Sequence, residues 1–303
     1  MTLALIVGGL VLLAFPGWLD RRHRFGPARF ARIGRSSMTL GFAGVVMGLM
    51  VWGAPAILHW ADAAGVPGLC DAAVHRLPFG GLELAIPMTA IAIAVIGRAF
   101  TAARRAQLNA RRARVDPFFG RHHQMGGYDV VVIPSAQLVA VGVPGVEPQI
   151  VLSEGLVAEL TSNELDAVIR HEVAHHRLRH RPYLVTAAII DQVFGWIPPV
   201  RSSAACLRNA VEEWADLEST GFSHARIATL RSALHRLASR RTSADRHAIE
   251  RRIASLDSYG RTEEAGRPYS VGPWVPAMLL GALGTLALVF TLQLTDAVIR
   301  CRV

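Results

Sequence analysis

Apolar residues gather in four long runs along the chain, and the segments between these runs are polar and rich in arginine. A helix of about 20 apolar residues is long enough to cross roughly 30 Å of hydrocarbon. We therefore expect an α-helical membrane protein with four transmembrane helices, at about residues 2–18, 38–60, 82–100 and within 271–303.

The arginines indicate how these spans are oriented. The loop 19–36 and the segment after residue 100 are strongly basic, whereas the loop 62–81 carries little positive charge. Basic loops remain on the cytoplasmic side of a membrane, so the N-terminus of the first span is expected outside. All 32 basic residues are arginine, and Ala and Gly are abundant, which is typical of GC-rich bacteria. We expect a multi-pass protein of the bacterial inner (plasma) membrane.

The pattern between the third and fourth spans is typical of a cytoplasmic α+β domain. Residues 129–134 predict a strand, and residues 138–143 and 149–152 predict a hairpin. Apolar positions recur at helical spacing further along the chain. The chain is therefore divided into three membrane helices, an inserted domain and a last span with a short outer tail, at residues 1–112, 113–270 and 271–303.

Composition and charge narrow the class of protein. Mean hydropathy is +0.32 and 51% of the residues are hydrophobic, which is high for a soluble protein. The formal charge of +9 would suit nucleic-acid binding, but the arginines flank the apolar runs, where anionic lipids explain them. We expect contact with the lipid bilayer and no direct binding of nucleic acid. Cys70, Cys206 and Cys301 lack Cys-x-x-Cys spacing, which excludes a cysteine-rich zinc site and leaves pairing of Cys70 with Cys301 open.

A helix is predicted after Thr161 or Ser162, either of which can cap it, with Glu164 reaching back to the first turn. Its apolar positions recur at helical spacing and would bury one face. They are Leu165, Val168, Ile169 and Val173.

The other face of this helix carries a possible metal site. His171 and His175 lie one turn apart, where two imidazoles can share a zinc ion, and Glu172 can take a proton from zinc-bound water. Because the chain contains 12 histidines, two solvated histidines on a polar helix face are the alternative interpretation. His176 and His180 fall outside the ligand geometry, and we expect them to be surface or membrane-facing groups.

Zinc in peptidases takes three protein ligands, so a third ligand must lie downstream. The metzincin spacing is excluded, because Leu178 and Arg181 stand where Gly and His would be required. A later run, Glu-x-x-Ala-Asp, offers Glu212 as the third ligand and, one turn on, Asp216 to orient a ligand histidine.

The apolar run 183–200 is an ambiguous segment. It contains Asp191, and an Asp at the bilayer centre costs about 2.5–3.5 kcal/mol. A crossing here would also place Glu212 on the opposite side of the membrane from His171. We therefore expect a helix that packs in the domain or dips into the inner leaflet.

The His-Glu-x-x-His motif followed by Glu-x-x-Ala-Asp resembles the gluzincin membrane peptidases, namely the HtpX and CAAX-endopeptidase group and the BlaR/MecR group of signal-transducing metallopeptidases. The resemblance covers about residues 113–260. It implies a zincin-like metallopeptidase domain with one Zn²⁺ per chain. The metal ligands would be His171, His175 and Glu212, and the catalytic residues would be Glu172 and Asp216.

The resemblance also implies a way of binding substrate. In these families an edge strand binds the substrate in extended form, and the equivalent strand would lie near residues 139–143. An ordinary hairpin explains this stretch equally well.

Four spans with the zinc domain between the third and fourth resemble the BlaR/MecR plan, in which an outside signal leads to proteolysis of a cytosolic repressor. Only residues 295–303 follow the last expected span, so we expect the C-terminal penicillin-binding sensor domain to be lacking. The expected partner is a protein or peptide substrate, such as a helix-turn-helix repressor. The alternatives are an HtpX-like quality-control protease of membrane proteins and a non-catalytic zinc-binding membrane receptor.

Overall fold

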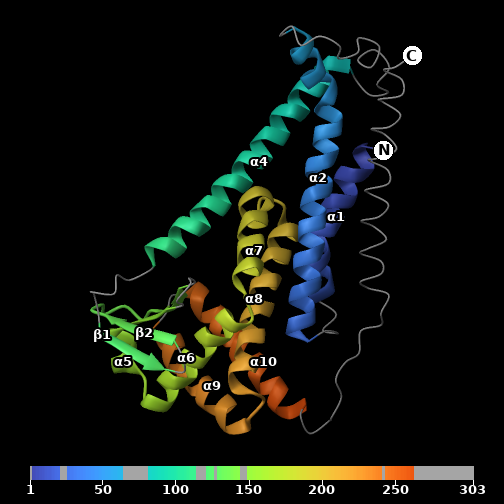
Figure 1. The fold of residues 1–303 in the computed structure, drawn as a ribbon. Helices are drawn as coiled ribbons and strands as arrows, with labels where there is room; N and C mark the ends of the chain where they lie inside the picture. Colours follow the sequence, from blue (N-terminus) through green and yellow to red (C-terminus); the bar gives the residue numbers. More distant parts are fainter. Residues whose placement is uncertain are drawn as a thin grey trace.

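The computed structural model describes residues 2–20, 26–63, 81–113, 121–125, 128–143, 149–240 and 243–262. Within these ranges three helices precede a four-stranded sheet and six helices follow it (Figure 1). The expected span within 271–303, together with Cys70 and Cys301, lies outside the described residues.

The three N-terminal helices are α1 (Thr2–Asp20), α2 (Pro27–Ala63) and α4 (Gly81–Arg112). Within the described residues, two stretches are long and apolar enough to cross a membrane, Pro27–Gly53 and Glu83–Arg112. The apolar part of α1 is shorter. Of the three expected spans that fall within the described residues, two therefore meet this test by length and composition alone.

The start of α2 differs from the expected loop 19–36, because residues 27–36 are helical. Proline suits the first position of a helix, where its missing N–H is not needed. Phe30 and Ala31 are buried in the core that α2 shares with α1 and α8, and this packing stabilises the additional helical turns. The arginines of this segment therefore lie on a helix, where their side chains are held at fixed spacing.

Pro16 interrupts the hydrogen bonding of α1, and neighbouring helices bond the polar groups around it. A proline provides no N–H for the carbonyl four residues earlier, which here belongs to Leu12. The hydroxyl of Ser37 on α2 donates to this carbonyl at 2.6 Å. The hydroxyl of Ser203 on α8 accepts from the Gly17 N–H at 2.8 Å and donates to the Ala14 carbonyl at 2.9 Å. Side chains from two neighbouring helices thereby fix the position of α1.

The sheet is built from β1 (Arg121–Met125), β2 (Tyr128–Ile133), β3 (Ala140–Val143) and β4 (Gln149–Ser153), in the order β1-β2-β4-β3. The predicted hairpin is confirmed, since β3 and β4 are antiparallel, with Val141 opposite Val151. β2 and β4 are parallel, and β1 is antiparallel to β2. β3 therefore forms one edge of the sheet.

The C-terminal helices are α5 (Glu154–Glu159), α6 (Ser162–Arg177), α7 (Arg181–Phe194), α8 (Pro198–Thr220), α9 (His224–Ser239) and α10 (Ser243–Thr262). The ambiguous run 183–200 is divided between α7 and the start of α8. These two helices lie alongside α1 and α2 (Figure 1). Asp191 forms an ion pair with Arg208 at 3.3 Å, so its charge is not isolated among apolar groups.

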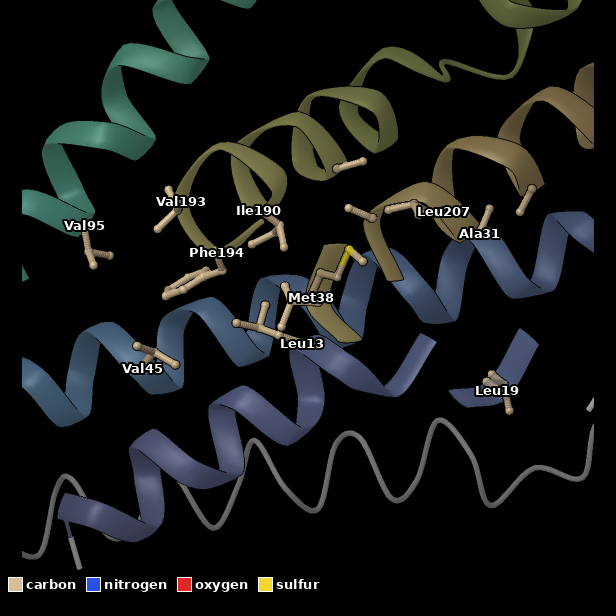
Figure 2. Packing of buried hydrophobic residues seen from close by; sticks show 14 of the residues in the cluster. Leu13, Leu19, Ala31, Met38, Val45, Val95, Ile190, Val193, Phe194 and Leu207 are labelled. Carbon is tan, nitrogen blue, oxygen red and sulfur yellow. The ribbon is translucent and has the colours of Figure 1, made fainter. Parts of the chain in front are cut away.

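The main hydrophobic core joins the N-terminal helices to the α7–α8 pair. Figure 2 shows Leu13 of α1 and Met38 of α2 packed near Ile190 and Phe194 of α7 and Leu207 of α8. A second cluster lies between the sheet and α6. The expected division at residue 112 therefore does not separate two independent cores.

Candidate metal centre

Helix α6, which carries the paired histidines, begins at a capping box. Thr161 is the N-cap, and the Glu164 carboxylate accepts a hydrogen bond from its backbone N–H at 2.9 Å. Glu164 is buried and also accepts from Ser232 at 2.6 Å and from Arg236 at 3.0 Å. Although burial alone would raise it, the bonds from Ser232 and Thr161 lower the pKa of Glu164 to about 2. This charged network fixes the start of α6 against α9.

The buried face of α6 packs against the sheet, as its apolar spacing predicted. Val168 and Ile169 are buried in a cluster with Ile150 and Leu152 of β4. Leu165 and Val173 pack against the same cluster and are partly buried. This packing sets the rotation of α6 about its axis, so that its histidines line a cavity.

The ligand atoms of His171, His175 and Glu212 lie close together. His171 Nε2 is 3.1 Å from His175 Nε2 and 3.4 Å from one carboxylate oxygen of Glu212. His175 Nε2 is 3.6 Å from the other oxygen of Glu212. One ligand atom from each residue lies within 4.8 Å of the other two. Helices α6 and α8 thus bring together the three residues that were expected to meet.

These separations fit a zinc site. Four ligands at roughly 2.0–2.1 Å in a tetrahedral arrangement lie roughly 3.3–3.4 Å from one another. Two imidazoles and a carboxylate are donors that zinc binds, and three such ligands leave a fourth position for water or substrate. The residues present could therefore hold one zinc ion.

The side chain of Glu172, on α6, reaches the edge strand β3. Its Oε2 accepts a hydrogen bond from the Gly142 N–H at 2.8 Å. This N–H is on the side of β3 that faces away from β4, because it donates to a side chain of α6. A carboxylate at the boundary between a metal site and an open strand edge is placed to exchange protons with groups bound there.

Asp216 lies on the same helix as Glu212, one turn later, and is buried. Its Oδ1 is 2.9 Å from Nδ1 of His171. A carboxylate on the far nitrogen of an imidazole fixes the orientation of the ring and makes the other nitrogen more basic. Asp216 thus contacts the ring of His171 on the nitrogen that does not face Glu212.

Arg252, on α10, is a member of this site that the sequence analysis missed. Its guanidinium donates to both oxygens of Asp216, at 2.5 and 2.8 Å, and its Nη1 lies 3.4 Å from Glu212. It also approaches the His171 ring at 3.3 Å. The only sequence signal was an arginine in an amphipathic helix, a signal shared by many other positions in this segment.

The pKa values reflect this crowding of charges. Burial and Arg252 act to lower the pKa of His171, but Asp216 and Glu212 outweigh them and raise it to about 9. Burial acts to raise the pKa of Asp216, but the positive charges of Arg252 and His171 lower it. Burial also acts to raise the pKa of Glu212, but its hydrogen bonds with His171 and His175 lower it. Both carboxylates are therefore negatively charged near neutral pH.

The expectation for His176 and His180 was wrong. His180 is fully buried, with its Nδ1 3.0 Å from Nδ1 of His175. His176 is partly buried between Tyr128 and Gly142. The loop after α6 turns back on the helix through the left-handed residue Arg179, and this turn brings His180 beneath His175.

A cavity of about 840 Å³ opens onto His171, His175 and Glu212. Its walls come from the end of α4, the edge strand β3, and helices α6, α7, α8, α9 and α10. The walls formed by α4 and α7 are mostly small or apolar, with Ala106, Ala110, Leu184, Val185 and Ala188.

A comparison with protein-family models gives a match to peptidase family M48 over residues 102–254. The matched range begins in α4 and ends in α10, so it contains the sheet and all the residues of the metal centre, including Arg252. No curated protein and no solved structure matches the chain.

Proposed function

Because the chain belongs to peptidase family M48, a family of metallopeptidases, we propose that it is a membrane-bound zinc endopeptidase. Its metal ligands in this proposal are His171, His175 and Glu212, and one Zn²⁺ is bound per chain. The observation that carries the proposal is the close approach of these three side chains from two helices, at separations that suit a tetrahedral metal.

When bound, zinc supplies Lewis acidity, which lowers the pKa of water and polarises the scissile carbonyl. Glu172 takes a proton from the attacking water and later delivers it to the leaving amine. Asp216 holds Nδ1 of His171, and this contact keeps Nε2 free and directed toward the metal position. Arg252 holds Asp216 in turn.

We propose that the substrate binds to β3 as an additional strand. The supporting observations are that β3 is an edge of the sheet and that all four of its residues line the cavity. Main-chain hydrogen bonds would then hold an extended peptide beside Glu172, and side-chain pockets would select among peptides.

The proposed location is the bacterial inner membrane, with the N-terminus outside and the metal centre on the cytoplasmic side. Two stretches of the described residues are long and apolar enough to cross a bilayer. Arginines occur near the start of α2 and at the end of α4, at Arg29, Arg32, Arg35, Arg111 and Arg112, as expected for cytoplasmic ends.

For the substrate, we propose a cytosolic protein, such as a helix-turn-helix repressor, that is cleaved in response to a signal, as in the BlaR/MecR type. The support is the likeness of the expected span arrangement to that group. A helix-turn-helix repressor encoded beside this chain and cleaved by it would identify the substrate.

A second candidate is the processing of membrane proteins, as in the HtpX group. One observation favours it, namely the apolar walls that α4 and α7 give to the cavity. Such walls suit a substrate segment that leaves a bilayer. Comparing both membrane and soluble proteins of cells that make the intact or the Glu172→Gln protein would separate the two candidates.

The catalytic proposal is tested on the intact chain purified in detergent. Glu172→Gln should keep its zinc and lose about 10²–10⁴-fold in peptide hydrolysis, the usual contribution of a general base. Glu250→Gln, which alters an exposed carboxylate of α10, is the matched control and should keep full activity. Undiminished hydrolysis by Glu172→Gln would remove Glu172 from the mechanism, and absence of zinc from the intact protein would overturn the proposal as a whole.

A further inference from the structure

Three aromatic rings form a cluster directly behind the metal centre. The centroid of the His180 ring lies 4.7 Å from that of Trp214 on α8 and 6.3 Å from that of Tyr183 on α7. The Tyr183 and Trp214 rings lie 6.0 Å apart at 85°. His180 is thus enclosed by the other two rings and has no exposed surface.

His180 reaches the metal centre through one hydrogen bond. Its Nδ1 is 3.0 Å from Nδ1 of His175, whose Nε2 faces Glu212. If His175 binds the metal through Nε2, its Nδ1 carries the proton and donates to His180. His180 then accepts a hydrogen bond from Nδ1 of His175, as Asp216 does from Nδ1 of His171.

The second ring nitrogen of His180, Nε2, is buried and has no hydrogen-bond partner among the described residues. A buried polar group without a partner opposes folding. Packing alone therefore does not account for a histidine at this position, whereas its bond to His175 does.

The same cluster is in contact with α2. The guanidinium of Arg32 lies 5.9 Å from the centre of the Trp214 ring, and that of Arg35 lies 5.1 Å from the centre of the Tyr183 ring. Both distances are within the range of cation–π attraction. Arg32 and Arg35 lie one turn apart on one side of α2, so a displacement of that helix moves both contacts together.

We propose that His180 is a positioning residue for His175, and that α2 controls this position through Arg32, Arg35 and the Trp214 and Tyr183 rings. The proposal rests on the metal centre of the proposed function and adds a route by which it is regulated. A change in the placement of α2, which is proposed to span the membrane, would shift the two rings and break the hydrogen bond that His175 donates to His180. The His175 imidazole could then rotate away from the metal position.

The first part is tested by zinc affinity and by the visible absorption of the cobalt-substituted protein, which reports the geometry of the ligands. His180→Leu removes the acceptor, and we expect zinc to bind about 10- to 100-fold more weakly, with an altered cobalt spectrum. His180→Asn places an oxygen near the position of Nδ1 and should restore most of the affinity. Equal zinc affinity of the intact protein and His180→Leu would overturn the positioning role, as would equal weakening by Leu and Asn.

The second part is tested with a pair of double variants that remove the same charge. Arg32→Ala with Arg35→Ala should weaken zinc binding about fivefold and alter the cobalt spectrum in the same direction as His180→Leu. Arg104→Ala with Arg105→Ala removes two exposed arginines of α4 and is the control. If the two double variants bind zinc equally, α2 does not control the site.

These measurements separate the proposal from the function on which it rests. The readouts are metal affinity and ligand geometry, so they hold even for a protein without measurable peptidase activity. If the intact protein binds zinc and hydrolyses peptide while all these variants match it, only the proposal fails. If the intact protein binds no zinc, both fail together.

Discussion

The imidazole of His171 and the carboxylate of Asp216 are in direct contact, with 2.9 Å between Nδ1 and Oδ1. Both side chains are almost fully buried, at 7% and 2% exposed. The contact joins the two helices that carry the candidate metal ligands, because His171 lies on α6 and Asp216 on α8. The orientation of the His171 ring is therefore set by a residue outside the cluster of His171, His175 and Glu212.

Asp216→Asn should weaken zinc binding by about 10- to 100-fold, because the amide holds the His171 ring less firmly and makes it less basic. Zinc affinity can be measured by competition with a coloured chelator. Asp257→Asn, which changes a surface carboxylate of α10, is the control and should bind zinc normally. Unchanged affinity of Asp216→Asn would show that the contact is not needed to orient His171.

Arg252→Gln should lower the free energy of unfolding by about 3–5 kcal/mol, the usual cost of leaving a buried charge without its partner. The buried charge that loses its guanidinium partner is that of Asp216, which keeps only its contact with His171. Arg251→Gln is a close control, since the neighbouring side chain is exposed and donates to Asn209. Thermal unfolding in detergent would show the difference, and equal midpoints for the two variants would contradict it.

Gly142→Ala tests how closely β3 approaches the base. A Cβ at this position would lie 2.5 Å from Nε2 of His176 and 3.2 Å from Oε2 of Glu172, so one or both side chains must move. We expect kcat/KM to fall by up to about 100-fold, because displacements near 1 Å in a catalytic group have effects of this size. Gly97→Ala on α4 is the control, because a Cβ there would have no atom within 4 Å, and it should leave kcat/KM unchanged. Normal activity of Gly142→Ala would mean that the two side chains adjust without effect on catalysis.

Glu164→Gln should make stability depend less on pH. Because the pKa of Glu164 in the folded protein is about 2, below the usual 4.5, its charge contributes stability that is complete above pH 4.5 and is lost as the pH falls through 2. The variant should therefore be less stable than the intact protein near neutral pH, and the gap should shrink below pH 4.5. Unfolding midpoints measured across this range would decide the matter, and a gap that does not change with pH would contradict the prediction.

Ser203→Ala should loosen the attachment of α1 to α8. The substitution removes the hydrogen bonds to the Gly17 N–H and the Ala14 carbonyl, and we expect a loss of about 1–3 kcal/mol in unfolding free energy. Ser202→Ala, at the exposed neighbouring position, should change little. Equal stability of the two variants would show that packing alone holds these helices together.

Much of the fold around the site could be predicted from local patterns. The capping box at Thr161 and Glu164, the buried face of α6 and the β3–β4 hairpin each depend on residues close together in the chain, and all three are confirmed. The expected metallopeptidase is confirmed at the level of the family. These signals were readable because helix caps, helical spacing and strand turns are determined by short segments.

The rest of the site depends on contacts between distant segments. Arg252 meets Asp216 only because α10 packs against α8, and no local pattern distinguishes it from its exposed neighbour Arg251. His180 was misread because its burial depends on the left-handed turn at Arg179. The helical start of α2 was missed because its arginines suggested a loop, whereas Phe30 and Ala31 are held by other helices.

The core that α1 and α2 share with α7 and α8 has a practical consequence for anyone preparing this protein. A fragment trimmed to the peptidase half, beginning after residue 112, would expose Ile190, Phe194 and Leu207 to water. Such a fragment would tend to aggregate, and the helix carrying Glu212 would lose the neighbours that hold it in place. Biochemistry on this protein therefore has to begin with the N-terminal helices attached.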